Sequence, residues 1–145
     1  MRKLLIMLSI CLLLGGCSKL PETYQYPNPL EEIVHVELTQ YQSEIPLNPK
    51  PEFFCLLKEL DVQEIQSFMN EVYLLPTEKV GTPPPMLDYG DYIAVVTYKN
   101  GDIELLGTSN IQYTEAGKMP TGVGSYHFVG DSFEELFLKY VDIED

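Results

Sequence analysis

Beyond Arg2 the chain of 145 residues contains no arginine, and it contains no tryptophan. The lack of arginine excludes bidentate recognition of phosphate or carboxylate groups by guanidinium side chains. Acidic residues outnumber Lys and Arg by 22 to 9, which gives a net charge of −13 at neutral pH. Because such a chain repels phosphate backbones and anionic head groups, the sequence predicts no nucleic-acid binding and no polybasic attachment to a membrane.

The chain also lacks an apolar run long enough to cross a bilayer, since a spanning helix needs about 20 apolar residues. Its longest run, from Leu4 to Leu14, is broken only by Ser9 and follows the basic pair Arg2-Lys3. The small residues at positions 15 and 16 come next. Basic, apolar and then small residues are the order of a secretory signal, so we expect residues 1–16 to be cleaved after export.

The segment Leu14-Gly15-Gly16-Cys17 resembles the lipobox of bacterial lipoproteins in spacing, flanks and terminal position. The resemblance implies that the Cys17 thiol receives a diacylglyceryl group and that cleavage falls between Gly16 and Cys17. It leaves open whether the new amine is also acylated. Two or more buried acyl chains anchor a protein stably, so we expect a membrane-held protein without a spanning helix. The alternative is a plain secretory signal in which the cysteine stands by chance.

The lipobox implies an extracytoplasmic location. In a Gram-positive host this is the outer face of the cytoplasmic membrane. In a Gram-negative host the outer membrane is also open, because Ser18 stands where an Asp is linked to inner-membrane retention. The host type and the oligomeric state stay open. The expected partners are the membrane, through the lipid at Cys17, and an unidentified surface protein; no cofactor is expected.

Cysteine is scarce, with three residues in the chain. Cys11 leaves with the signal and Cys17 carries the lipid, so Cys55 has no partner for an intramolecular disulfide. Cys55 lies in the apolar run 53–57, which predicts a buried strand and an inert thiol. Three prolines within residues 18–29 indicate an extended segment, so we expect a lipidated tether over residues 17–29 and a single domain over 30–145.

The rest of the chain alternates strand and helix signals in the order ββ-α-ββββ-α. Asp61 and Glu64 have capping-box spacing, and Asn100-Gly101 suits a tight type I′ hairpin turn. This order predicts an α+β fold, an antiparallel sheet of five to six strands with two helices packed on one face. It looks like that of many small uncharacterised lipoproteins of Gram-positive bacteria, a resemblance of arrangement that supplies no active site. The expected strands lie near residues 33–38, which could continue toward Tyr41, and near 53–57, 92–98, 103–106, 111–113 and 125–128. One helix is expected over about 62–73, and a second follows the capping-box spacing of Asp131 and Glu134, with one apolar face from Phe133 to Val141.

The sequence predicts no catalytic residue and no metal site. His35 and His127 have no ligand-type spacing, and the chain has no nucleophile elbow, phosphate-binding loop or dinucleotide fingerprint. Tyrosine is the one abundant residue type that favours binding. Tyr92 and Tyr98 would share one face of a strand, which makes them candidate binding residues.

Three hypotheses follow. The first is a lipid-anchored surface protein with a non-catalytic binding or structural domain. The second is a surface enzyme whose site combines dispersed carboxylates, tyrosines and a histidine, which a recess holding His35 or His127 beside two carboxylates would favour. The third is an inhibitor or immunity-like module, which suits a small acidic surface protein.

Overall fold

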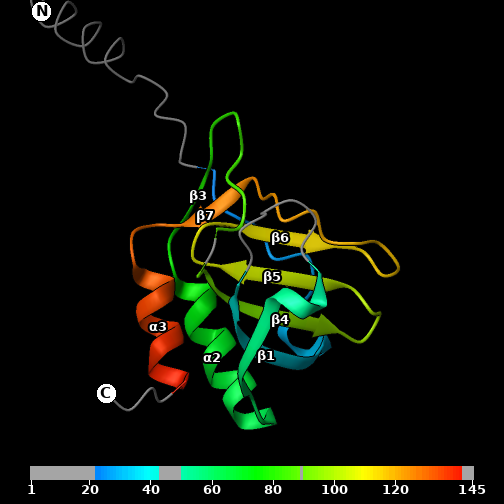
Figure 1. Ribbon diagram of the computed structural model, residues 1–145. Coiled ribbons are helices and arrows are strands. Elements are labelled where there is room, and N and C mark those ends of the chain that lie inside the picture. The colour runs from blue at the N-terminus through cyan, green and yellow to red at the C-terminus, as the bar shows by residue number, and fades with distance from the viewer. Residues whose placement is uncertain (1–21, 43–49, 89, 142–145) are drawn as a thin grey trace, which may run out of the picture.

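The structure is a computed structural model that describes residues 22–42, 50–88 and 90–141. Seven strands in these ranges form one antiparallel sheet in the order β2-β1-β4-β5-β6-β7-β3 (Figure 1). The strands are β1 (Ile33–Tyr41), β2 (Phe54–Glu59), β3 (Thr77–Lys79), β4 (Tyr92–Tyr98), β5 (Ile103–Gly107), β6 (Ile111–Thr114) and β7 (Tyr126–Phe128). The helices are α2 (Val62–Leu74) and α3 (Ser132–Val141), with the short 3-10 helices η1 (Leu30–Glu32) and η2 (Pro51–Phe53).

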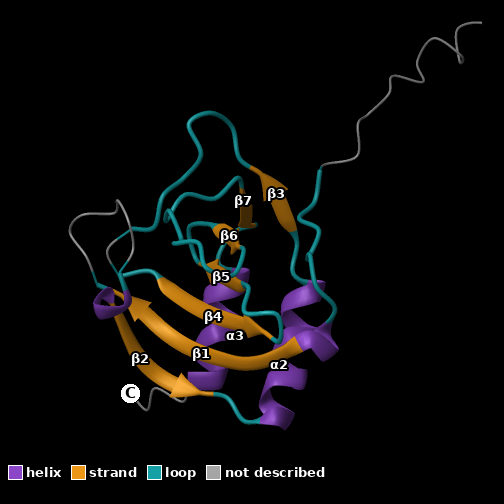
Figure 2. Ribbon diagram, turned by 90° about the vertical axis from the view of Figure 1, so that its right-hand side faces the viewer, coloured by secondary structure: helices purple, strands orange, loops and turns teal. Residues whose placement is uncertain are grey.

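Both α-helices cover one face of the sheet (Figure 2). Their buried side chains pack against the strand residues that point to that face in one continuous apolar core. A smaller apolar cluster, formed by Tyr41, Leu87, Ile93 and Leu105, lies on the opposite face. The α+β class and the antiparallel sheet expected from the sequence are therefore confirmed.

Local signals explain the well-predicted elements. The Asp61 carboxylate accepts hydrogen bonds from the backbone N–H groups of Gln63 and Glu64, and the Glu64 side chain accepts one from the Asp61 N–H, which completes the capping box. The hairpin between β4 and β5 differs from the expected two-residue turn. Tyr98 N–H bonds Asp102 O, and Gly101 has a φ of 85°, so residues 99–101 form a longer loop with a bulge.

The predicted strand count and order are wrong, because the sequence prediction of five to six strands missed β3. This strand follows α2 directly, and among the described residues it pairs with β7 alone, at the end of the sheet. It is three residues long and buries Thr77 alone, so it has no apolar alternation from which it could be recognised.

The run around Cys55 forms the strand β2, but the prediction that it is buried is wrong. β2 lies at the edge of the sheet beside β1, so its side chains are mostly exposed: Leu56 is 53% exposed and the Cys55 thiol is free and exposed. The register passes from Leu38↔Lys58 to Thr39↔Leu56 and leaves Leu57 without a cross-strand partner. Such a bulge, next to a lysine, discourages further strand pairing at an edge.

Residues before Leu30 also contact the domain. The backbone N–H of Tyr24 donates to Thr77 Oγ1 at 2.9 Å, and the rings of Tyr24 and Tyr26 pack against the core. Residues 22–29 are therefore a strap that lies on the domain, within the segment 17–29 that the sequence predicts to be an extended tether. Residues 1–16 and Cys17 lie outside the described residues, and neither described α-helix has the length and apolarity that a membrane span requires.

Candidate functional site

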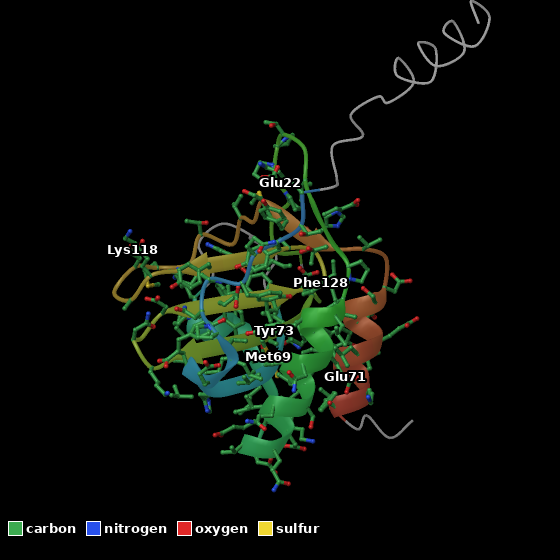
Figure 3. The ribbon with its side chains drawn as sticks, turned by 180° about the vertical axis from the view of Figure 1, so that it is seen from behind. Glu22, Met69, Glu71, Tyr73, Lys118 and Phe128 are labelled. Carbon is green, nitrogen blue, oxygen red and sulfur yellow. The ribbon has the colours of Figure 1, made fainter. Side chains whose placement is uncertain are left out.

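A recess of about 520 Å³ opens beside β6, on the edge of this strand that faces β7. Its walls come from the strap, from β6 and from the segment that connects β6 to β7. Figure 3 shows Glu22 and Lys118, at the two sides of this region, toward the end of the molecule that carries β7. The residues that line it include Tyr24, Tyr113, Thr114, Lys118, Met119, Ser125 and Tyr126.

The recess exists because β7 meets β6 at one residue pair only, Ile111↔Tyr126. The connecting segment swings away from the rest of β6 and is held by the Gln112 side chain. Gln112 Nε2 donates to Thr121 Oγ1 at 2.9 Å, and the N–H of Gly122 donates to Gln112 Oε1 at 2.8 Å. One buried amide thus fixes the outer wall by both of its ends.

Three tyrosine rings line the recess, and a carboxylate accepts a hydrogen bond from each hydroxyl. Tyr24 donates to Glu104 Oε1, Tyr113 donates to Asp102 Oδ2, and Tyr126 donates to Glu22 Oε1 at 3.3 Å. Tyr24 and Tyr126 also contact each other edge to face, with ring centroids 5.4 Å apart. The hydrogen bonds of Tyr24 and Tyr113 leave these two rings little rotational freedom to lose when a ligand binds.

The carboxylate behind Tyr24 is itself fully buried. Glu104 is 0% exposed, and it accepts hydrogen bonds from Tyr24 and, at 2.5 Å, from Tyr98. Burial raises the pKa of the Glu104 carboxyl, and the two hydrogen bonds act in the opposite direction. Burial and the nearby Glu104 likewise raise the pKa of Tyr24 far above its ordinary value and that of Tyr73 to about 12.

Two further tyrosines extend this buried cluster. The hydroxyls of Tyr26 and Tyr73 are buried and, within the described residues, have no hydrogen-bond partner. Their rings lie 4.3 Å apart, and burial raises the pKa of Tyr26. The strap therefore contributes two rings to a tyrosine cluster around a buried acid, which explains why it stays on the domain.

The pKa of Asp102 is shifted downward, in contrast to that of Glu104. Hydrogen bonds from Tyr113, from the backbone N–H of Ala116 and from Asn100 hold the pKa of this carboxyl below its ordinary value. The same bond to Asp102 raises the pKa of Tyr113. Both shifts describe a neutral tyrosine that donates to an ionised carboxylate, so Tyr113 presents its ring and not a phenolate.

The predicted binding residues Tyr92 and Tyr98 do share one face, as their spacing indicated, but the helices cover that face. Tyr98 is 1% exposed, and the ring of Tyr92 lies 5.1 Å from that of Phe137 on α3. The sequence thus indicated tyrosine as the residue type of the site, but the tyrosines that line the recess are Tyr24, Tyr113 and Tyr126. The missed residue Tyr24 lies among prolines, and its contact with Glu104 joins residues 80 positions apart.

The histidines lie away from the recess. His35 Nε2 is 3.4 Å from Glu37 Oε1 and its Nδ1 is 3.3 Å from Glu59 Oε1, on partly exposed neighbouring strands. His127 Nε2 is 3.0 Å from Glu78 Oε1. Neither histidine lines the recess, and within the described ranges no cluster of three or more His, Cys, Asp or Glu is placed to hold a metal ion.

A second, more apolar groove of about 370 Å³ lies on the sheet face that the helices leave uncovered. Val95, Ile103 and Leu105 form its floor, and Lys118 and Met119 line both this groove and the recess. The segment around Met119 thus stands between the two hollows.

Comparison with known proteins finds no match for this chain among protein families, curated proteins or solved structures.

Proposed function

We propose that this chain is a lipid-anchored surface protein whose domain is a non-catalytic binding domain, with the recess beside β6 as its binding site. One observation carries the proposal: three tyrosine rings line the recess, and a carboxylate holds each hydroxyl. Tyrosine offers a large apolar ring at low entropic cost, and prior fixation of the ring lowers that cost further.

The acid–base properties of the site also favour binding over proton transfer. Glu104 is sealed behind Tyr24, with no exposed surface. The hydroxyls of Tyr24 and Tyr113 donate to carboxylates, and their pKa values lie above the ordinary one. A general base needs a pKa near the working pH and contact with the reacting group, and neither tyrosine meets the first condition.

The strap limits the distance between the recess and a lipid on Cys17. Five residue steps separate Cys17 from Glu22, and an extended chain covers at most about 3.5 Å per residue, which makes about 17 Å. Glu22 accepts a hydrogen bond from Tyr126 at the recess. A lipid on Cys17 would therefore keep the recess close to the membrane surface, which supports a ligand that is itself at that surface.

The attachment is tested by the variant Cys17→Ala in the native host. Radioactive fatty acid should label the wild-type chain and should not label the variant. The variant should either be released from the membrane or accumulate as the unprocessed precursor. Labelling that survives the substitution would contradict the lipid anchor.

The binding site is tested by a photo-crosslinking amino acid at Ser125, which is exposed and lines the recess. The matched control places the same amino acid at Ser67, which is exposed on α2. Illumination of intact cells should give an adduct at position 125 and none at position 67. Equal adducts at both positions, or none at position 125, would refute the recess as the binding site.

A further inference from the structure

The hydrogen-bonding pattern of β6 decides which of its backbone groups face the recess. Gly107 N–H donates to Asn110 O at 2.8 Å, so these residues form a hydrogen-bonded pair between β5 and β6. Such pairs alternate along antiparallel strands, so Gln112 and Thr114 direct their backbone groups to β5. The N–H and C=O of Ile111 and Tyr113 therefore point the other way, toward β7.

The two outward-facing residues have different neighbours. Ile111 is opposite Tyr126 of β7. Continued pairing would bring Gly124 opposite Tyr113, but the Gly124 N–H donates to Pro85 O at 3.2 Å instead. In the described part of the chain, no strand pairs with Tyr113 at this edge, and the recess lies beside it.

We infer that the recess binds an extended peptide segment that pairs with β6 as an added strand at Tyr113. This inference rests on the proposed binding function and names the ligand class of that same site. An added strand gains affinity from main-chain hydrogen bonds and specificity from pockets for alternate side chains. The backbone N–H and C=O of Tyr113 would supply the main-chain hydrogen bonds. The recess walls would supply the pockets for the side chains.

The walls stand on both faces of the added strand. Tyr24 lies on the helix-covered side of the sheet, where its hydroxyl reaches Glu104. Met119 lies on the other side, since it also lines the groove over Val95 and Leu105. Successive side chains of an extended peptide point to opposite faces, so they would contact these two walls in turn. The recess volume of about 520 Å³ falls within the range that is typical of ligand sites.

The charges favour a neutral or basic peptide. Lys118 at the recess already pairs with Glu115 at 2.5 Å, and Lys79 nearby pairs with Glu22 at 3.0 Å. The chain as a whole carries a net charge of −13. A chain with this excess of negative charge attracts a basic peptide and repels an acidic one.

The edge strand β2 offers a poorer docking site. The residue Leu57 forms a bulge in β2, and Lys58 follows it, so this edge carries two features that discourage strand addition. The part of β6 at Tyr113 has no register shift, and Lys118 at the recess is paired with Glu115. This contrast favours β6 over β2 as the site of strand addition.

The test uses the full-length lipoprotein in detergent micelles and a displayed library of random heptapeptides. Peptides should be enriched on the wild-type protein and on the control variant Ser67→Trp. The variant Ser125→Trp fills the recess and should reduce their recovery at least tenfold. The absence of enriched peptides, or equal recovery on Ser125→Trp, would overturn the inference.

A second measurement acts on the ligand and does not depend on any protein variant. Each backbone nitrogen of an enriched peptide is methylated in turn. Because Tyr113 offers one C=O to the added strand, and alternate N–H groups of a strand point away from its neighbour, binding should fall at least tenfold at one position and little at the positions on either side of it. Uniform tolerance of methylation would contradict strand addition.

The two proposals can fail separately. Cross-linking at position 125 in cells, without any enriched peptide, would leave the proposed function standing and overturn the peptide ligand. Enriched peptides that are insensitive to N-methylation would likewise overturn strand addition and leave the binding function standing. Absence of cross-linking at position 125 would overturn the proposed function itself.

Discussion

The hydroxyl of Tyr98 donates a 2.5 Å hydrogen bond to Oε2 of Glu104, on the same face of the neighbouring strand. Tyr24 of the strap donates to the other carboxylate oxygen. Two tyrosines from segments far apart in the sequence thus satisfy an acid that has no exposed surface. The strap is fixed to the domain through this acid, and the recess takes one of its walls from the strap.

The variant Glu104→Gln should change how stability depends on pH. Burial raises the pKa of Glu104 above its ordinary value of 4.5, so the folded protein holds this proton more tightly than the unfolded chain. The stability from this group is complete below its ordinary pKa and is lost as the pH rises through the raised value. The free energy of unfolding of the wild type should therefore fall relative to Glu104→Gln as the pH rises above 4.5.

Urea unfolding of both proteins over a series of pH values measures this difference. The comparison cancels the other titrating groups, because both proteins share them. Parallel stability curves from acid to neutral pH would contradict a raised pKa at Glu104.

The variant Tyr24→Phe should loosen the strap. It removes one of the two donors to Glu104, and the loss of a hydrogen bond to a buried acid costs about 1–3 kcal/mol. The matched control is Tyr126→Phe, whose exposed 3.3 Å bond to Glu22 should be worth less than about 0.5 kcal/mol. Urea unfolding measures both values. Equal losses of unfolding free energy in the two variants would show that the bond from Tyr24 to Glu104 stabilises the domain no more than an exposed bond does.

The variant Gly124→Ala should be destabilising for a steric reason. A Cβ at this position would lie 2.4 Å from the carbonyl oxygen of Ile111 and 2.9 Å from Cβ of Asn110. Neither atom is the far end of a flexible side chain, so the backbone must shift, at a cost of about 1–3 kcal/mol. The control Gly81→Ala has no atom within 4 Å of the new Cβ and should stay within about 0.5 kcal/mol of the wild type. Thermal unfolding of the two variants measures both effects, and equal stability of the two would contradict the close approach at Gly124.

The elements that the sequence predicted well are those with local signals. The capping box of Asp61 and Glu64 and the alternating run of β4 depend on residues a few positions apart. Burial of β2 could not be predicted in this way, because an apolar run of five residues gives no information on its place in the sheet. β2 proved to be an edge, since β1 and β4 pair with each other in the interior.

The candidate site was predictable in residue type only. Tyr113 and Tyr126 lie in strands that the sequence indicated, but the recess depends on where β7 leaves β6, which no local pattern specifies. The prolines around Tyr24 favoured a tether. The contact that draws Tyr24 onto the domain comes from Glu104, an acidic residue in a strand whose burial is unusual for its type.

The exposure of Cys55 predicts a reactive thiol. In native buffer a maleimide should label the processed protein at Cys55 as fast as it does in urea, because the thiol lies on the edge strand and is not buried. The control Cys55→Ser should take up no label if the Cys17 thiol carries lipid. Mass spectrometry of the intact protein counts the labels. A labelling rate that rises many-fold in urea would contradict the exposed position of Cys55.

The recess should lie closer to the membrane than the edge strand β2 does. Residue 125 adjoins Tyr126 of β7, which bonds Glu22, whereas Cys55 lies on β2, five strand spacings away in the sheet. At about 4.8 Å per spacing these strands are about 24 Å apart. With a lipid on Cys17, a fluorophore at Ser125→Cys in a Cys55→Ser background should transfer energy to acceptor lipids more efficiently than one on native Cys55.

The matched control lengthens the connection to the lipid. About 20 Gly and Ser residues inserted between Pro21 and Glu22 add about 25 Å of flexible reach. Because the domain can then turn and move away from the bilayer, energy transfer from both positions should fall and the difference between them should shrink. Equal transfer from positions 125 and 55 without the insertion would show that the strap does not keep the recess at the membrane.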